Sequence, residues 1–257
     1  MARSMTLKEN KKRKTTPLTD PRLKGLGAPV EVRRHPKARR LTLRVSRTRR
    51  AVIVTLPPRC DIGEAGTFVH SNIDWVRKCL GDIPEPVPFN DKAIIPLRGI
   101  PHLVSFIGQR LANGTVCTVD RGPDLYPEIR VGGQLEHAPR RLHDWLFSEV
   151  RRDLDRCIQQ HARFLNLTPK RFTVRDQTSR WGSCSSTGSL SFSWRLILAP
   201  PFVLDYVAAH EVAHLSEMNH GQKFWALVHK TMPRTPEAKQ WLQIYGMDLH
   251  RYGLNND

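Results

Sequence analysis

The residues best suited to chemistry form the segment His210-Glu211-Val212-Ala213-His214. Residues four apart on a helix project from one face, a turn apart, so the two imidazoles can bind one metal ion. Zinc prefers nitrogen ligands in a tetrahedral arrangement, and a catalytic zinc site keeps one position open. Two histidines and a glutamate buried in an apolar helix without partners would destabilise the folded state. We therefore expect His210 and His214 to hold Zn²⁺, with Glu211 as the general base of a hydrolysis.

A third ligand is needed, and His220 is our first choice. It follows His214 by six residues, the offset of the HExxHxxGxxH pattern of metzincins. A straight helix would carry it about 9 Å further along the axis, so the chain must leave the helix and turn back. The metzincin glycine is replaced by Glu217, and Asn219 is expected to make the turn in the left-handed conformation. Glu217 is a competing ligand that lies too far along the helix, and Glu237 is a further alternative.

The helix that must present these residues is predicted from Val203 to about Glu217, after Pro200-Pro201 stop the preceding strand. That strand, Ser189–Leu198, shows apolar alternation. It is expected either to hold an extended substrate as an edge strand or to be a plain buried strand. The other predicted elements of this half are helices at 139–165, 222–230 and 236–245, a strand at 172–176 and a polar turn at 181–188.

The N-terminal half is expected to be mainly β, which makes the fold class α+β. Residues 1–28 are predicted to be a disordered basic tail, because they contain few large apolar groups. Period-two patterns between Val30 and Leu56 predict antiparallel strands, followed by one helix over Asp61–Leu80 with a capping box at Asp61 and Glu64. Four short strands follow, at 93–97, 102–107, 115–119 and 128–131. We thus predict a β-rich N-terminal domain over 29–133 and the metal-binding domain over 134–257.

Charge is unevenly distributed along the 257 residues. The formal net charge is +17, and residues 1–50 hold 17 Lys or Arg against 3 Asp or Glu. Such a basic end can bind nucleic acid or nucleotides, or can be a solubilising tail or a solvated strand face. The five cysteines are odd in number and show no metal-binding spacing, which argues against a disulfide framework. No segment has the length and apolarity of a membrane span or a signal peptide, so we expect a cytoplasmic protein with no membrane partner.

A family resemblance rests on several of these segments. Arg180-Trp181-Gly182-Ser183-Cys184-Ser185, Asp205-Tyr206-Val207 before His210-Glu211-Val212-Ala213-His214, Asn219-His220 and Phe224-Trp225 together resemble the YgjP-like metallopeptidases. These look related to SprT/Spartan-type proteases and minigluzincins. The resemblance implies a minigluzincin-like zincin core of a long helix, a small sheet, the HExxH helix and C-terminal helices.

The same resemblance implies the composition of the site. Zinc would lie on His210, His214 and His220, with Glu211 catalytic. The Arg180–Ser185 turn would lie near the active cleft, where Arg180 is a candidate for binding an anionic group or a developing oxyanion. Ser183 is a further substrate-binding candidate. Trp181 is a packing residue beneath the site and a weaker candidate for substrate contact.

Three functions remain open on this reading. The leading hypothesis is peptide-bond hydrolysis of a protein or peptide substrate, with Glu211 as general base. A second is a metal-dependent nucleoside triphosphate pyrophosphohydrolase, in which Arg180 and the basic N-terminal region hold phosphates. The sequence shows no Gly-rich phosphate loop that would favour it. The third is a DNA-associated protease or binding module that uses the basic N-terminal region.

Overall fold

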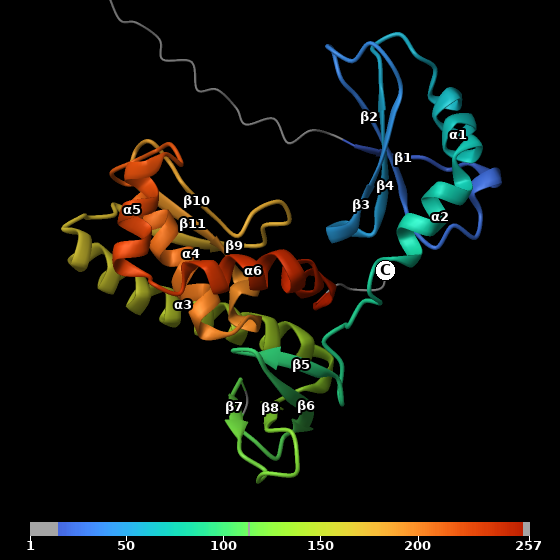
Figure 1. Ribbon diagram of the computed structural model, residues 1–257. Helices are drawn as coiled ribbons and strands as arrows, with labels where there is room; N and C mark the ends of the chain where they lie inside the picture. The colour runs from blue at the N-terminus through green and yellow to red at the C-terminus, as the bar shows by residue number, and fades with distance from the viewer. Residues whose placement is uncertain (1–14, 113, 254–257) are drawn as a thin grey trace, which may run out of the picture. The chain divides into compact units, whose positions relative to one another are not determined.

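The computed structural model describes residues 15–112 and 114–253 (Figure 1). The chain is of mixed α+β class and divides into two compact units, Met1–Pro84 and Glu85–Asp257. This division differs from the predicted boundary near Gly133. The strands between 94 and 132 share a core cluster with the long helix that follows them, because residues such as Ile129 and Val131 pack with Leu142 and Leu146.

The first unit is built on a four-stranded sheet with the order β1-β2-β4-β3. Its strands are β1 (Thr16–Pro17), β2 (Val30–Arg34), β3 (Thr42–Ser46) and β4 (Ala51–Leu56). The prediction of antiparallel strands is confirmed for β3 and β4 but wrong for β2 and β4, which run parallel. In this sheet β4 lies between β2 and β3, the two strands that precede it in the sequence. The alternation of apolar and polar residues shows which face of a strand is buried, but it does not determine the order of the strands in the sheet.

Two helices cover one face of this sheet, α1 (Ile62–Ser71) and α2 (Ile73–Gly81). The predicted capping box is confirmed, with the Asp61 carboxylate accepting from the Gly63 N–H at 2.6 Å and Glu64 accepting from the Asp61 N–H at 3.1 Å. The single predicted helix is wrong. Asn72 departs from helical geometry with φ −115° and ψ 20°, and its side-chain amide donates to the Phe68 carbonyl at 2.8 Å. An asparagine bonded to the preceding turn in this way ends α1 and redirects α2.

The prediction of disorder over residues 1–28 is wrong for the part that the structure describes, residues 15–28; residues 1–14 lie outside it. β1 pairs with β2, and a short 3₁₀ turn, Pro21–Leu23, follows. Leu23 and Leu26 are both buried in the core of the unit. These buried leucines and the pairing of β1 hold the segment, although its average composition is that of a disordered tail.

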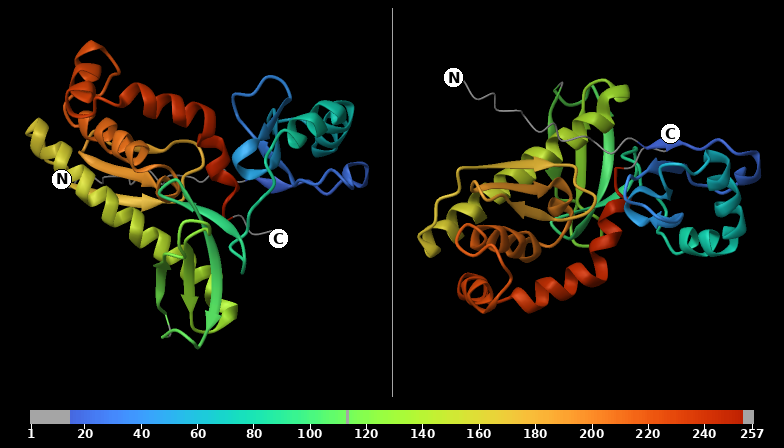
Figure 2. Two further views of the ribbon diagram at one scale, coloured as in Figure 1. Left: turned by 60° about the horizontal axis from the view of Figure 1, so that its bottom comes forward. Right: turned by 90° about the horizontal axis from the view of Figure 1, so that it is seen from above.

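The second unit begins with a four-stranded sheet of order β5-β6-β8-β7. The strands are β5 (Ile94–Leu97), β6 (Ile100–Gly108), β7 (Val116–Val119) and β8 (Glu128–Gly132), which confirms the four predicted strands. This sheet packs on α3 (Ala138–Leu165), the predicted long helix, as the green strands beside it show in Figure 2. Its buried apolar stripe is the reason the helix was recognisable.

A three-stranded sheet and three helices complete the second unit. The sheet has the order β10-β11-β9, with β9 (Arg171–Arg175), β10 (Gly182–Cys184) and β11 (Ser189–Ser193). The helices are α4 (Pro201–Ala213), α5 (Gln222–Thr231) and α6 (Thr235–Tyr245). The predicted strand Ser189–Leu198 ends at Ser193 and continues as a 3₁₀ helix, Trp194–Leu198. β11 is also the central strand, and its Leu190 and Phe192 are buried. Of the two alternatives, the buried strand is therefore confirmed and the edge strand is wrong.

No described helix has both the length and the apolar character needed to cross a membrane. The five cysteines are all free thiols.

Candidate metal centre

The helix α4 places the HExxH residues in the interior of the second unit. It begins with Pro201 at its first position, where a missing N–H costs nothing. Nine of its 13 residues are buried, and it contacts α3, α5, α6 and β10. A helix that is apolar on all sides belongs in a core. The polar residues His210, Glu211 and His214 at its C-terminal end are therefore held in partly dry surroundings, where imidazole and carboxylate need partners.

The helix ends earlier than the sequence predicted. Its last residue is Ala213, and His214 is the C-cap. The Leu215 N–H donates to Val212 at 3.0 Å and the Ser216 N–H donates to Ala213 at 3.1 Å, both bonds of a tightening last turn. The chain thus leaves the helix directly after the second histidine. Asn219 does not have the expected positive φ. Among the described non-glycine residues, a positive φ occurs at Arg50, Lys92, Arg98 and Asn166.

The early end of α4 brings His220 back to the other two histidines. One ligand atom from each of His210, His214 and His220 lies within 4.8 Å of the others, and the described residues contain no second such group of three His, Cys, Asp or Glu. The Nε2 atoms of His210 and His220 are 3.0 Å apart. The competing ligands do not join them: the Glu217 carboxylate is not in the group, and Glu237 pairs with Arg234 at 2.8 Å.

The protonation of these histidines suits a metal ion. Burial lowers the pKa of His210 to about 4, with a smaller effect of the neighbouring imidazoles, and burial also lowers the pKa of His214. Both rings are then neutral near pH 7, as metal ligands must be. The Nδ1 of His214 lies 3.0 Å from the Glu217 carbonyl and donates to it, which leaves Nε2 with the free lone pair. Three imidazoles meeting at one point are a donor set that fits a divalent transition metal.

An aromatic side chain packs against all three imidazoles. The ring centroid of Phe224, fully buried on α5, lies 4.8 Å from His210, 4.5 Å from His214 and 4.8 Å from His220. Because α5 begins two residues after His220, this packing orients the third histidine as well as the first two. Trp225 lies 5.9 Å from the rings of His210 and His220.

Tyr206 was not singled out for a role from the sequence. Its hydroxyl lies 3.5 Å from His210 Nδ1, and burial raises its pKa to about 12. It precedes His210 by four residues on α4. The helical spacing could have indicated this contact, because residues four apart share a face. The phenol is therefore neutral and placed to orient the His210 ring.

Glu211 is a buried carboxylate beside the histidines. It is 5% exposed, and its Oε2 has no hydrogen-bond partner. Burial raises its pKa to about 7, although the charge of Arg180 opposes that shift. An uncompensated buried carboxylate is costly for folding alone, which is the mark of a functional group.

Gly182 on β10 makes room for that carboxylate. A Cβ built at this position would lie 2.6 Å from both Cγ and Oε1 of Glu211. Such a distance is far below ordinary contact, so only glycine allows the strand and the carboxylate to approach this closely. Sequence reasoning missed this residue because the contact joins two segments about 30 residues apart.

The predicted substrate-binding residues all border the histidines. Arg180 and Ser183 line a cleft of about 470 Å³ whose other walls include His210, Glu211 and His220. Trp181 lines an adjoining hollow of about 220 Å³ and packs against His250 in a tilted arrangement, with ring centroids 5.0 Å apart. The structure therefore brings these side chains to the expected place, and their roles toward a substrate stay predictions.

A buried histidine joins the helices that hold the centre. His161 on α3 is fully buried, with Nε2 2.9 Å from the carboxylate of Asp205 on α4 and Nδ1 2.6 Å from the hydroxyl of Thr231 on α5. With Nε2–H donating to Asp205, Nδ1 is free to accept from Thr231, an assignment made from the partners. Since α4 presents two of the histidines and α5 follows the third, this network fixes the spacing of the two helices.

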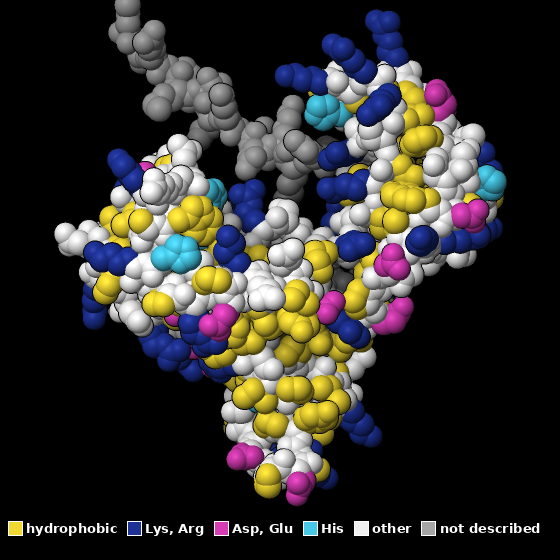
Figure 3. Space-filling model, in the orientation of Figure 1, with side chains coloured by type: hydrophobic (Ala, Val, Ile, Leu, Met, Phe, Trp, Pro, Cys, Tyr) yellow, Lys and Arg dark blue, Asp and Glu magenta, His cyan; other side chains and the backbone are white. Residues whose placement is uncertain are grey.

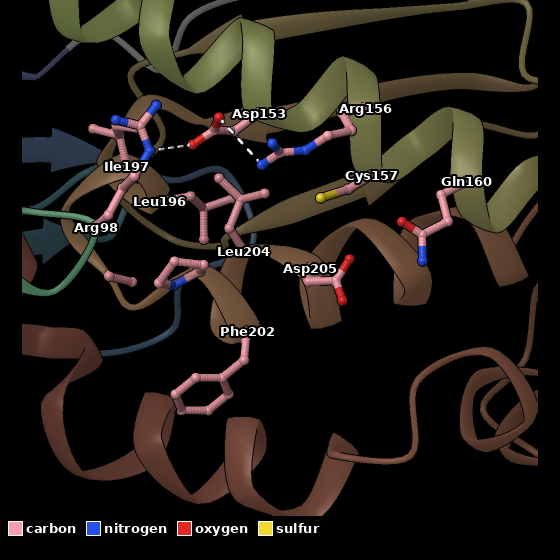
Figure 4. A pocket seen from close by; sticks show the side chains of 12 residues that line it. Arg98, Asp153, Arg156, Cys157, Gln160, Leu196, Ile197, Phe202, Leu204 and Asp205 are labelled. Atoms are coloured by element: carbon pink, nitrogen blue, oxygen red, sulfur yellow. Dashed lines mark hydrogen bonds and ion pairs between the residues drawn. The ribbon is translucent and has the colours of Figure 1, made fainter.

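An arginine from the second unit's first sheet joins that sheet to α3. Arg98 lies in the turn between β5 and β6, and its guanidinium pairs with Asp153 and Glu149 of α3 at 2.8 Å each. Figure 4 shows Asp153 between Arg98 and Arg156, at the rim of a hollow of about 240 Å³ that Phe202 of α4 also lines. The turn and α3 are thereby held together by partly buried charge pairs.

Comparison with known proteins gives one family and one solved structure. The profile of the family described as YgjP-like, metallopeptidase domain, matches residues 39–245. The crystal structure of the metallopeptidase zymogen of Pyrococcus abyssi abylysin is 19% identical to the chain, over 36% of this chain and 92% of its own length, with a TM-score of 0.33. At that TM-score the likeness supports no conclusion. A comparison with curated proteins gives no match.

Proposed function

The chain belongs to the YgjP-like metallopeptidase family, and on that premise we propose that it hydrolyses peptide bonds at a zinc ion held by His210, His214 and His220. The observation that supports this most strongly is the convergence of three imidazole nitrogens within 4.8 Å, beside the buried and unpaired carboxylate of Glu211. Three histidines with an open fourth position are the donor set of a catalytic zinc site, whereas structural sites are closed by four protein ligands.

The zinc ion and the residues around its position would each contribute to a different step of the hydrolysis. Bound zinc supplies Lewis-acid chemistry, which polarises a carbonyl and makes water acidic. Glu211 accepts the proton of the attacking water at its unpartnered oxygen and passes it to the leaving amine nitrogen. Burial raises its pKa to about 7, so this carboxylate holds a proton more readily than an exposed glutamate. Arg180, exposed beside the cleft, is placed to stabilise negative charge on the substrate.

An extended peptide has a strand edge available at the cleft. β10 pairs with β11 on one side only in the described sheet, and its residues Gly182 and Ser183 line the cleft beside Glu211. Main-chain pairing to such an edge holds a peptide with its carbonyls at fixed intervals. β10, rather than the predicted β11, is thus the strand proposed to bind substrate.

Peptide hydrolysis is favoured over hydrolysis of a nucleoside triphosphate. Among the residues that line the cleft, Arg180 is the only lysine or arginine. A triphosphate has several negative charges, and phosphate sites usually combine several donors. One exposed cation suits the single developing oxyanion of an amide better.

The test compares wild type with Glu211→Gln on quenched fluorescent peptide mixtures and on nucleoside triphosphates, after loading with zinc. Glu211→Gln removes the proton acceptor without touching a ligand, so turnover should fall by at least about 100-fold while zinc content is unchanged. The exposed Glu136→Gln serves as the matched control and should retain full activity. Wild-type turnover in Glu211→Gln, or cleavage of nucleotides but not peptides, would remove the proposal.

A further inference from the structure

The first unit contains a basic surface that the proposed peptidase chemistry does not use. Residues 32–60 include ten Lys or Arg and no Asp or Glu. They cover most of β2, the loop to β3, β3 itself, the turn after it and β4. A solvated surface normally mixes both signs of charge, and a single-sign field attracts an oppositely charged partner.

The strand register places part of this charge on one face of the sheet. α1 and α2 cover the other face, where Val52 and Val54 are fully buried. Alternation along β4 turns Ile53 and Thr55 to the uncovered face. Their register partners there are Glu31 and Arg33 on β2 and Arg44 and Thr42 on β3, and the one acidic side chain among them, Glu31, is paired with Arg49. Arg33 reaches across this face, where its Nε donates to the Thr55 hydroxyl at 2.8 Å, and Ile53 on the same face is 4% exposed.

Part of the basic surface is anchored, and part is available to a partner. Arg34 donates to the carbonyls of Pro58 and Cys60, and Arg49 pairs with Glu31, so these two cations stiffen the unit. Six others are exposed and form no ion pair within the described residues. They are Lys37, Arg39, Arg40, Arg44, Arg47 and Arg59. In Figure 3 the dark blue side chains gather at the upper end of this unit and along its flank opposite α1.

The chemistry of this surface selects among polyanions. Residues 15–67 contain no Phe, Tyr or Trp, and the first aromatic residue, Phe68, packs into the core from α1 on the other face of the sheet. Proteins that bind single strands rely on aromatic side chains on which the bases stack. A surface of guanidinium groups without aromatic residues instead suits the regularly spaced phosphates of a duplex. The same surface lacks an exposed apolar anchor of the kind that inserts into a lipid surface.

We propose that this basic surface, formed by the uncovered sheet face and the loop at 35–40, binds the phosphate backbone of double-stranded nucleic acid. The binding is expected to be independent of base sequence, because phosphate contacts hold the duplex without reading it. Duplex binding does not depend on zinc or on the peptidase proposal, so an experiment can refute either proposal without affecting the other.

The test uses the full-length protein and a fluorescently labelled 20-base-pair DNA duplex, followed by fluorescence anisotropy from 20 to 200 mM salt. Wild type should bind, and the logarithm of its binding constant should fall linearly with the logarithm of the salt concentration. The triple variant Arg39→Gln, Arg40→Gln and Arg44→Gln should weaken binding at least tenfold at 100 mM salt and reduce that slope by about 2 to 3.

The matched control removes the same charge from exposed arginines of the second unit, as Arg110→Gln, Arg121→Gln and Arg163→Gln. Residues 1–14 stay unchanged in every variant, and circular dichroism verifies folding. The control should bind like wild type. Equal weakening in both triple variants would mean that only net charge matters, and would overturn the proposal. So would no binding of the wild type at 20 mM salt, tighter binding of a single strand of the same length, or tighter binding to phosphatidylserine vesicles.

Discussion

Gly182→Ala tests how closely β10 must approach the proposed general base. Gly182 does not have a left-handed φ, so alanine fits the strand backbone, and the obstacle to its Cβ is the Glu211 side chain. The Cβ would lie 2.6 Å from Cγ and Oε1, and ordinary contact begins near 3.4 Å. The carboxylate must therefore move by about 0.8 Å. Misplacement of a reacting group by about 1 Å costs roughly 100-fold, so kcat should fall about 10- to 100-fold, or about 1.4–2.7 kcal/mol.

The assay measures kcat, KM and zinc content of the zinc-loaded variant with a peptide that wild type cleaves. The three atoms nearest to the added methyl group all belong to Glu211 and none to a histidine, so one zinc per chain should remain. Gly81→Ala is the control: it lies in the first unit, and a Cβ there meets nothing within 4 Å. An unchanged kcat in Gly182→Ala would refute the reasoning. Loss of zinc would also refute it, since the defect would then lie in the ligands and not in the base.

Two further substitutions test the supports of the metal centre. Phe224→Ala removes the ring that packs against all three histidines, so it should lower the free energy of unfolding by about 3–5 kcal/mol. It should also weaken the affinity for zinc, measured by competition with a chelator. A zinc affinity equal to that of wild type would contradict this prediction. His161→Leu leaves the Asp205 carboxylate without its imidazole partner and should cost about 1–3 kcal/mol in urea unfolding. In a double-mutant cycle, the variant that combines His161→Leu with Asp205→Asn should lose less free energy of unfolding than the sum of the two single losses. Strictly additive losses would show that the two side chains do not interact.

The elements that the sequence predicted well are those with strong local signals. The helix Ala138–Leu165 was placed to within one residue because its apolar positions recur at helical spacing over seven turns. The capping box at Asp61 and Glu64 was recognisable from the spacing of two residues. The grouping of His210, His214 and His220 followed from helix geometry and one offset. Each of these signals lies within a short stretch of chain.

The features that the sequence did not predict depend on contacts between distant segments. The parallel pairing of β2 with β4 and the central place of β11 are matters of strand order, which alternation leaves open. The close approach of Gly182 to Glu211 joins a strand to a helix, and the bond from His161 to Asp205 joins two helices 44 residues apart. The burial of Leu23 was hidden because composition averages over a segment, whereas packing depends on single side chains.

Metal content tests the central claim most directly. Wild type, His210→Ala, His214→Ala and His220→Ala are equilibrated with zinc, freed of excess by gel filtration and analysed by mass spectrometry, with the exposed His70→Ala as control. Three converging imidazoles predict one zinc per chain in wild type and His70→Ala, and a large loss in each of the other variants. Wild type without zinc, or a full equivalent retained by His220→Ala, would contradict the account.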